Sequence, residues 1–149
     1  MGVGLQIAVG SGLLMVNISL AAIAAVFLEQ LFNRCHGWLM REPHYPKLAL
    51  LLAGVSLVIL GVVTTGVWVW AGAYMHLGVF ATLEESVYFS LVSYTTLGFG
   101  DVLLHKDWRL LAGMEAANGF LNFGMLTALL VETLRTARLG QAEHRRKRG

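Results

Sequence analysis

The sequence predicts an all-α membrane protein in which three helices span the bilayer and a shorter, re-entrant helix leads into a glycine-containing loop. Of the 149 residues, 56% are hydrophobic and 13% are charged, whereas about a quarter of the residues in a soluble domain are charged. Lys, Arg, Asp and Glu are absent from residues 1–28 and 48–83, and Glu115 is the only one of them between 110 and 131. Each run exceeds the roughly 20 apolar residues that a helix needs to cross a bilayer.

These runs divide the chain into an N-terminal helix within 1–33, a basic loop at 34–47, a second helix at 48–75, a third at 108–138 and a basic tail at 139–149. The first run contains Ala22-Ile23-Ala24, a small-x-small pattern that also occurs at signal-peptide cleavage sites. No basic segment precedes it, however, and the run is longer than the roughly 7–15 apolar residues of a signal peptide. We therefore expect the helix to be retained and to pack outside the second helix, facing lipid.

The distribution of Lys and Arg predicts how the chain is oriented. Arg34, Arg41 and Lys47 lie in the first loop, the tail carries Arg145-Arg146-Lys147-Arg148, and the residues before Arg34 contain neither Lys nor Arg. Because cytoplasmic segments are enriched in these residues, we expect a multi-pass protein of the plasma (inner) membrane with its N-terminus outside and its C-terminus inside. Membrane lipids are then partners of the chain, with anionic lipid at the basic tail.

A short helix is predicted between the second and third spans, at 82–94. Thr82-Leu83-Glu84-Glu85 matches a capping box, with Thr82 as the N-cap and Glu85 three residues later. The helix is too short to cross the bilayer, so it should enter the membrane and stop there. The partial negative charge at its C-terminal end would then favour a cation inside the membrane.

The residues at 95–101, Thr95-Thr96-Leu97-Gly98-Phe99-Gly100-Asp101, follow this helix directly. Gly98 and Gly100 can take backbone angles that other residues disfavour. Non-helical backbone at membrane depth persists only where it is buried in protein or lines a water-filled path. The segment resembles the selectivity filter of potassium channels, T-x-G-[YF]-G-D, at every position. The chain is thus similar to small prokaryotic potassium channels of the two-transmembrane, pore-loop type, with one extra N-terminal helix.

The resemblance implies passive, potassium-selective conduction by a homotetrameric pore, with no catalysis, no nucleic-acid partner and no cofactor besides the permeant ion. It implies that K+ binds at Thr96, Leu97, Gly98 and Phe99, that Gly100 completes the filter, and that Thr95, Phe89, Val92 and Asp101 support it. The third span, with Gly119-x-x-x-Phe123-Gly124, is similar to the inner helix of these channels. There, Phe123, Thr127 and Val131 would face the cavity, and Gly119 would be a hinge or a close-packing site.

The chain also departs from the family. It has Phe99 where many members have tyrosine, Phe89 where they have tryptophan in the pore helix, and Val92 where some have glutamate. We therefore expect packing alone to hold the filter. The departures leave two alternatives open, a non-selective cation channel and a non-conducting regulatory subunit with the pore fold.

Other polar residues allow further readings. Gly98-Phe99-Gly100-Asp101 also fits the G-x-G-D motif of intramembrane aspartyl proteases, but that chemistry needs two paired carboxylates, and the only other aspartate, Asp107, lies in the same loop. Glu115 is either functional or hydrogen-bonded to the pore helix through Ser90, Ser93 or Tyr94. A pH-sensing role of His76 or His105 is left open.

Overall fold

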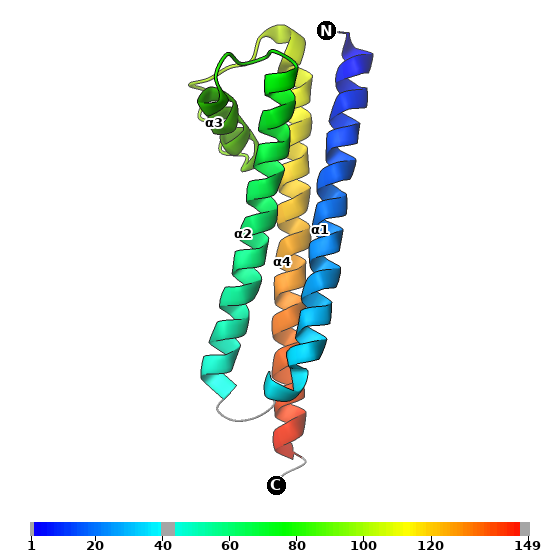
Figure 1. Cartoon of the computed structure of the whole chain (residues 1–149), viewed down its shortest axis with the longest axis vertical. Helices are drawn as coiled ribbons and strands as arrows, with labels where there is room; N and C mark the ends of the chain where they lie inside the picture. Colours follow the sequence, from blue (N-terminus) through cyan, green and yellow to red (C-terminus); the bar gives the residue numbers. More distant parts are fainter. Residues whose placement is uncertain (1, 40–43, 147–149) are drawn as a thin grey trace.

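The computed structural model describes residues 2–39 and 44–146, and the described residues form helices and loops without strands. The elements in order are α1 (Val3–Leu39), α2 (His44–His76), α3 (Leu83–Tyr94), the single 3-10 turn η1 (Lys106–Trp108) and α4 (Arg109–Arg146). The three long helices run side by side, and α3 lies beside the ends of α2 and α4 nearest the N-terminus (Figure 1). The predicted all-α fold with a short helix between the second and third spans is confirmed.

Among the described residues, three helical segments are long and apolar enough to cross a membrane, at Val3–Cys35, Pro46–His76 and Lys106–Gly140. The helices extend further than predicted, since α1 continues to Leu39 and α4 to Arg146. Much of the expected loop at 34–47 and of the expected tail at 139–149 is therefore helical. Pro46 does not prevent this, because it falls in the first turn of α2, where a missing N–H costs no hydrogen bond. Arg41, Lys147 and Arg148 lie outside the described residues.

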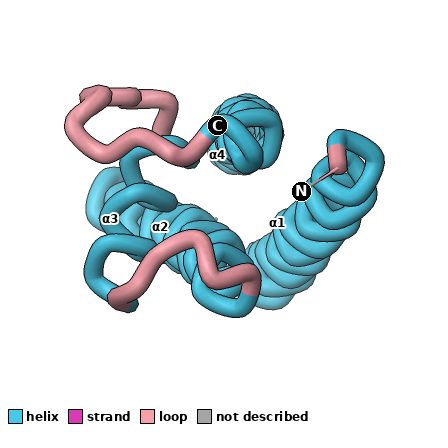
Figure 2. Tube along the Cα trace, turned by 90° about the horizontal axis from the view of Figure 1, so that it is seen from above, coloured by secondary structure: helices cyan, strands magenta, loops and turns pink. Residues whose placement is uncertain are grey.

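The helix α1 packs on both α2 and α4, and more extensively on α4. Figure 2 shows the three long helices from above. The expected contact of the first helix with the second is present, and the contact with α4 is an addition to it. The face of α1 that packs against the other helices is a buried stripe at helical spacing, which comprises Gln6, Gly10, Asn17, Ala21 and Leu28. At Gly10 the helices are so close that an added Cβ would lie 2.5 Å from the sulfur of Met114. Small residues of this kind let membrane helices approach one another.

An aromatic cluster anchors α3 against α2 and comprises Trp70, Tyr74, Phe80, Phe89 and Tyr94. The ring of Phe89 meets that of Tyr74 edge-on, with centroids 5.5 Å apart. The Ser86 hydroxyl also donates to the carbonyl of Ala71 at 2.7 Å. Aromatic packing and a buried hydrogen bond thus fix the orientation of the short helix.

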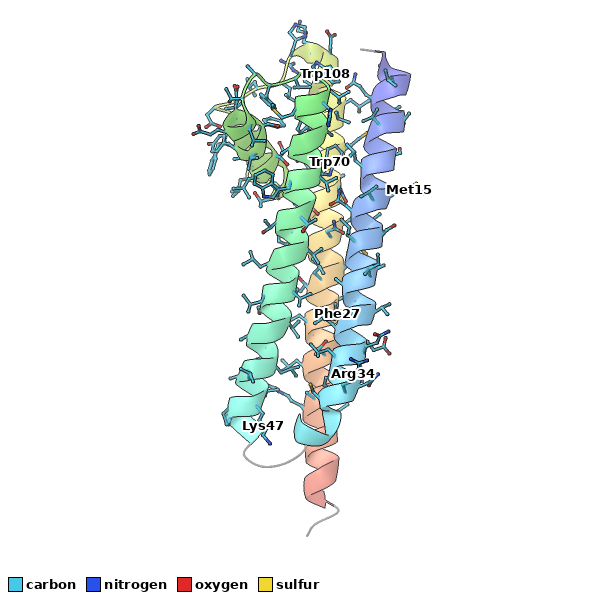
Figure 3. All side chains as sticks on the ribbon, viewed as in Figure 1. Met15, Phe27, Arg34, Lys47, Trp70 and Trp108 are labelled. Atoms are coloured by element: carbon cyan, nitrogen blue, oxygen red, sulfur yellow. The ribbon has the colours of Figure 1, made fainter. Side chains whose placement is uncertain are left out.

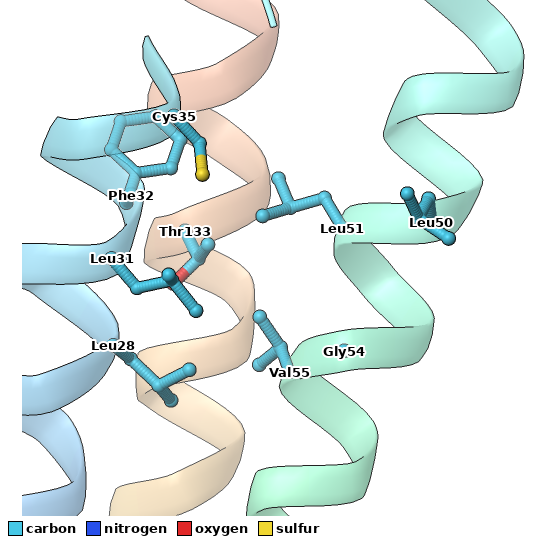
Figure 4. Close-up of a pocket in the computed structure, with 9 residues that line it drawn as sticks. All are labelled: Leu28, Leu31, Phe32, Cys35, Leu50, Leu51, Gly54, Val55 and Thr133. Carbon is cyan, nitrogen blue, oxygen red and sulfur yellow. The ribbon is translucent and has the colours of Figure 1, made fainter. Parts of the chain in front are cut away.

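The opposite ends of the long helices are joined by aliphatic contacts. An apolar groove there is lined by α1, α2 and α4, including Leu28, Phe32, Leu51, Val55 and Thr133 (Figure 4). Large apolar side chains on the outer surface point away from the bundle, as Met15 and Phe27 of α1 do (Figure 3). An apolar outer surface of this kind is what a helix in contact with lipid requires.

Candidate functional site

The start of α3 has the cap that the sequence predicts. Thr82 has extended backbone angles, and its hydroxyl accepts a hydrogen bond from the amide of Glu85 at 3.2 Å. Glu84 and Glu85 lie in the first turn, where negative charge is favoured by the helix dipole. The helix begins at Leu83, directly after its N-cap, and ends at Tyr94.

The loop after α3 is bonded to the last turn of that helix. Four consecutive amides donate to its carbonyls: Thr95 to Leu91 at 3.1 Å, Thr96 to Ser93 at 2.9 Å, and Leu97 and Gly98 to Val92 at 3.0 and 3.3 Å. The hydroxyl of Thr95 also donates to the Leu91 carbonyl at 2.6 Å. Carbonyls that a helix end normally leaves unpaired are thereby satisfied. The first half of the loop is consequently held to α3 by its own backbone.

Alternate residues of the loop have left-handed backbone angles. The φ values are 58° at Thr96, 56° at Gly98 and 77° at Gly100, while Leu97 and Phe99 between them are not left-handed. The expectation for the two glycines is confirmed. An added Cβ at either glycine would meet nothing within 4 Å, so glycine is required there by the backbone angle and not by space.

The left-handed conformation of Thr96 was not expected from its residue type. A β-branched residue rarely adopts a positive φ, and such a conformation costs on the order of 1–3 kcal/mol. The amide of Thr96 and that of the next residue are both bonded to α3, which holds the strained residue in place. Strained backbone of this kind is concentrated at ligand and ion sites.

Asp101, at the far end of the loop, is held by a side chain that sequence reasoning missed. The hydroxyl of Tyr88 donates to Asp101 Oδ2 at 2.5 Å. The expectation that packing alone holds this region is therefore wrong. This hydrogen bond lowers the pKa of Asp101 below its usual range and raises the pKa of Tyr88. The only sequence signal for Tyr88 is its place on α3, about two turns before the loop begins.

The other predicted support residues lie behind the loop. Phe89 and Val92 are both buried, Phe89 in the aromatic cluster and Val92 with its carbonyl bonded to the loop. Between the loop and α4, His105 Nδ1 lies 3.2 Å from Asp107 Oδ2, and both side chains are mostly exposed. Of these two residues, Phe89 packs α3 against α2, and Val92 bonds directly to the loop.

Glu115 of α4 is fully buried and joins three helices. Its carboxylate accepts from the Ser90 hydroxyl at 2.5 Å and from the Tyr74 hydroxyl at 2.7 Å. The expected bond to Ser90 of the pore helix is confirmed, and the bond to Tyr74 of α2 is an addition to it. A buried carboxyl group needs such partners, because an unpaired one is costly at membrane depth.

The predicted cavity residues lie on a face of α4 that is exposed in the single chain. Phe123, Thr127 and Val131 share one stripe, and all three are exposed in the single chain. Asn118, Gly119, Asn122 and Leu126 are buried against the other helices. Phe123 also lines a hollow together with Thr95, which brings the stripe to the start of the loop.

Gly119 lies against the end of α3. An added Cβ would collide with the carbonyl oxygen of Tyr94 and would lie 2.7 Å from its carbonyl carbon. The helix α4 runs through this position without interruption. Close packing therefore accounts for a glycine here, and the hinge role stays a prediction.

We predict that Gly119→Ala destabilises the protein by about 1–3 kcal/mol, the usual cost of overpacking a tight contact. The matched control is Gly113→Ala in the same helix, where an added Cβ would meet nothing within 4 Å. The control should be neutral or stabilising by up to about 1 kcal/mol, because Ala favours a helix over Gly. Thermal unfolding in detergent measures both, and equal melting temperatures would contradict the close contact.

Comparison with known proteins bears on this arrangement as a whole. A family model described as “Ion channel” matches residues 62–136, which is half of the chain and includes the end of α2, all of α3, the loop and most of α4. No match was found among curated proteins or among solved structures. The matched segment contains the capped short helix, the loop in which every second residue has a left-handed backbone conformation, and the buried Glu115. The chain belongs to the ion channel family.

Proposed function

We propose that this ion channel is selective for K+ and conducts it passively through the carbonyls of residues 96–100. The observation that carries the proposal is the alternation of left-handed residues at Thr96, Gly98 and Gly100 with Leu97 and Phe99. When left-handed residues alternate with residues that are not left-handed, successive peptide groups turn toward one side of the chain. In a strand, by contrast, successive peptide groups point to opposite sides. A ring of carbonyls arranged in this way replaces the hydration shell of K+.

The K+ sites are assigned to Thr96, Leu97, Gly98 and Phe99, with Gly100 completing the filter and the Thr96 hydroxyl adding to the innermost site. Two features of α3 support a cation at this place. The helix ends at Tyr94, directly before the loop, so the negative end of its dipole adjoins the proposed sites. The bonds from the loop amides to Val92 and Ser93 keep the amide hydrogens engaged with the helix.

A homotetramer is proposed because one chain supplies one loop and a K+-sized ring needs four. Exposed apolar surface supports burial between copies, since Leu97 is 59% exposed and Phe99 66% exposed in the single chain. In this assembly Phe123, Thr127 and Val131 face the pore cavity on the cytoplasmic side of the filter. The N-terminus and the loop face outward, the basic C-terminal end of α4 meets anionic lipid on the cytoplasmic side, and the membrane is the plasma membrane.

Reconstitution in liposomes tests the function directly. With a K+ gradient and a fluorescent flux readout, we expect K+ to pass and Na+ to pass far more slowly. Equal K+ and Na+ permeability would favour the non-selective cation channel, which the exposed Phe99 without a hydroxyl makes the nearest competitor. Absence of flux with either ion would favour a non-conducting regulatory subunit.

Gly98→Ala should abolish selective K+ flux while leaving membrane insertion unchanged. An Ala at a φ of 56° is strained by on the order of 1–3 kcal/mol per subunit, and the strain recurs in every copy of the ring. Gly78→Ala is the matched control, because Gly78 also has a positive φ of 67° and open space around its Cβ position but lies outside the loop. Selective flux through Gly98→Ala, or equal loss in the two variants, would show that 96–100 is not the filter.

Tyr88→Phe should make conduction more sensitive to external acid. In the parent, the Tyr88–Asp101 bond holds the Asp101 pKa low. The stabilisation that this bond gives the loop is therefore complete above the usual aspartate range, and it is lost only as pH falls through the lowered pKa. Without the bond the pKa of Asp101 returns toward its usual range, so flux should fall at a higher pH than in the parent. Asp101→Asn, which cannot titrate, is the control. Coincident pH profiles for parent and Tyr88→Phe would contradict a supporting role of this pair.

A further inference from the structure

Tyr94 is the last residue of α3 and directly precedes the loop, yet its side chain is fully buried. Its hydroxyl accepts a hydrogen bond from Asn122 Nδ2 of α4 at 2.5 Å. Its backbone carbonyl lies against Gly119 of the same helix. Tyr94 is thus held through its side-chain hydroxyl and through its backbone carbonyl. The loop amides are bonded to the turn of α3 that contains Tyr94.

Asn17 of α1 reaches the same place from the helix outside the matched channel segment. The side chain is 2% exposed, and its Nδ2 donates to the carbonyl of Leu13 at 3.0 Å. A Cβ added at Gly66 of α2 would lie 2.5 Å from the Tyr94 hydroxyl oxygen and 2.7 Å from Asn17 Oδ1. Both oxygens therefore converge on one point, where α2 has room only for glycine.

The chemistry of the two side chains is complementary. The Tyr94 oxygen already accepts from Asn122, so its own proton remains to be donated. Asn17 Oδ1 is an acceptor, since the amide nitrogen of Asn17 is the atom bonded to α1. An amide in the middle of a membrane helix is costly unless it has polar partners, and hydrogen bonds between helices are its usual use.

We propose that Asn17 is a positioning residue for the filter: together with the Tyr94 hydroxyl at Gly66, it holds the C-terminal end of α3 and so the loop bonded to it. The role of α1 is then to complete the support of the ion pathway, in addition to anchoring the chain in the membrane. This inference rests on the proposed function. Asn17 acts through Tyr94, since Asn17 itself belongs to α1 and the ions are assigned to residues 96–99.

A double-mutant cycle of Asn17→Ala and Tyr94→Phe tests the coupling in the full-length protein. The first readout is the ratio of K+ to Na+ flux in liposomes. The second is the rise in the thermal dissociation temperature of the assembly when Na+ is replaced by K+, which reports ion binding without requiring conduction. Each single variant should reduce both quantities. The double variant should be no worse than the more affected single variant, which gives a coupling of about twofold or more in the flux ratio.

Ser19→Ala is the matched control, because Ser19 is also a polar α1 residue bonded to its own helix, to Met15 at 2.8 Å, but is exposed. It should leave both readouts unchanged. If Asn17→Ala does not assemble, Gly66→Ala replaces it, since its methyl group displaces the same two oxygens from the side of α2.

The outcomes separate the two proposals. Additive effects, or single variants that match the parent, overturn the role of Asn17 while the parent's selective flux stands. A parent that is stabilised by K+ but conducts without selectivity, or not at all, overturns the proposed function, and the cycle is then decided on the stabilisation alone. A parent that shows neither flux nor stabilisation by K+ overturns both.

Discussion

The structure depends on one constraint, which is that irregular backbone inside a membrane must have its polar groups paired or directed at an ion path. The chain meets it by bonding four consecutive loop amides to the last turn of α3. This commits the amides of residues 95–98 to the helix, and under the proposed function the carbonyls of residues 96–100 face the ions. It also makes the position of α3 decisive, because any shift of that helix is passed to the loop.

Several buried polar side chains hold α3 in place. Ser86 bonds it to α2, Ser90 bonds it to Glu115 of α4, and Tyr94 is bonded by Asn122 and approached by Asn17. Buried serine, asparagine and glutamate would be unfavourable on surfaces that face lipid, and each lies on the side of its helix that faces the bundle. The outward sides carry large apolar residues instead. The buried polar side chains of α1, α3 and α4, together with the buried aromatic and aliphatic face of α2, are therefore the physical basis of how α3 is held.

Much of this arrangement could be predicted from the sequence, because it depends on local rules. Thr82 and Glu85 mark the start of α3, charge-free runs mark the spans, and glycines mark the left-handed positions 98 and 100. What escaped prediction depends on how helices are rotated and paired. The bonds from Tyr88 to Asp101 and from Tyr74 to Glu115 join residues 13 and 41 positions apart, and no local pattern selects those partners. The packing of α1 on α4 escaped for the same reason, since no local pattern shows against which helix the buried stripe of α1 packs.

The central claim is that residues 96–100 of four chains surround one axis. Imaging of single particles of the full-length protein in lipid nanodiscs with K+ measures this directly. The account predicts four chains, with residues 96–100 nearest the axis, ion density between them, and Phe123, Thr127 and Val131 facing the space below. An assembly of two or three chains, or a loop 96–100 that faces lipid, would contradict it.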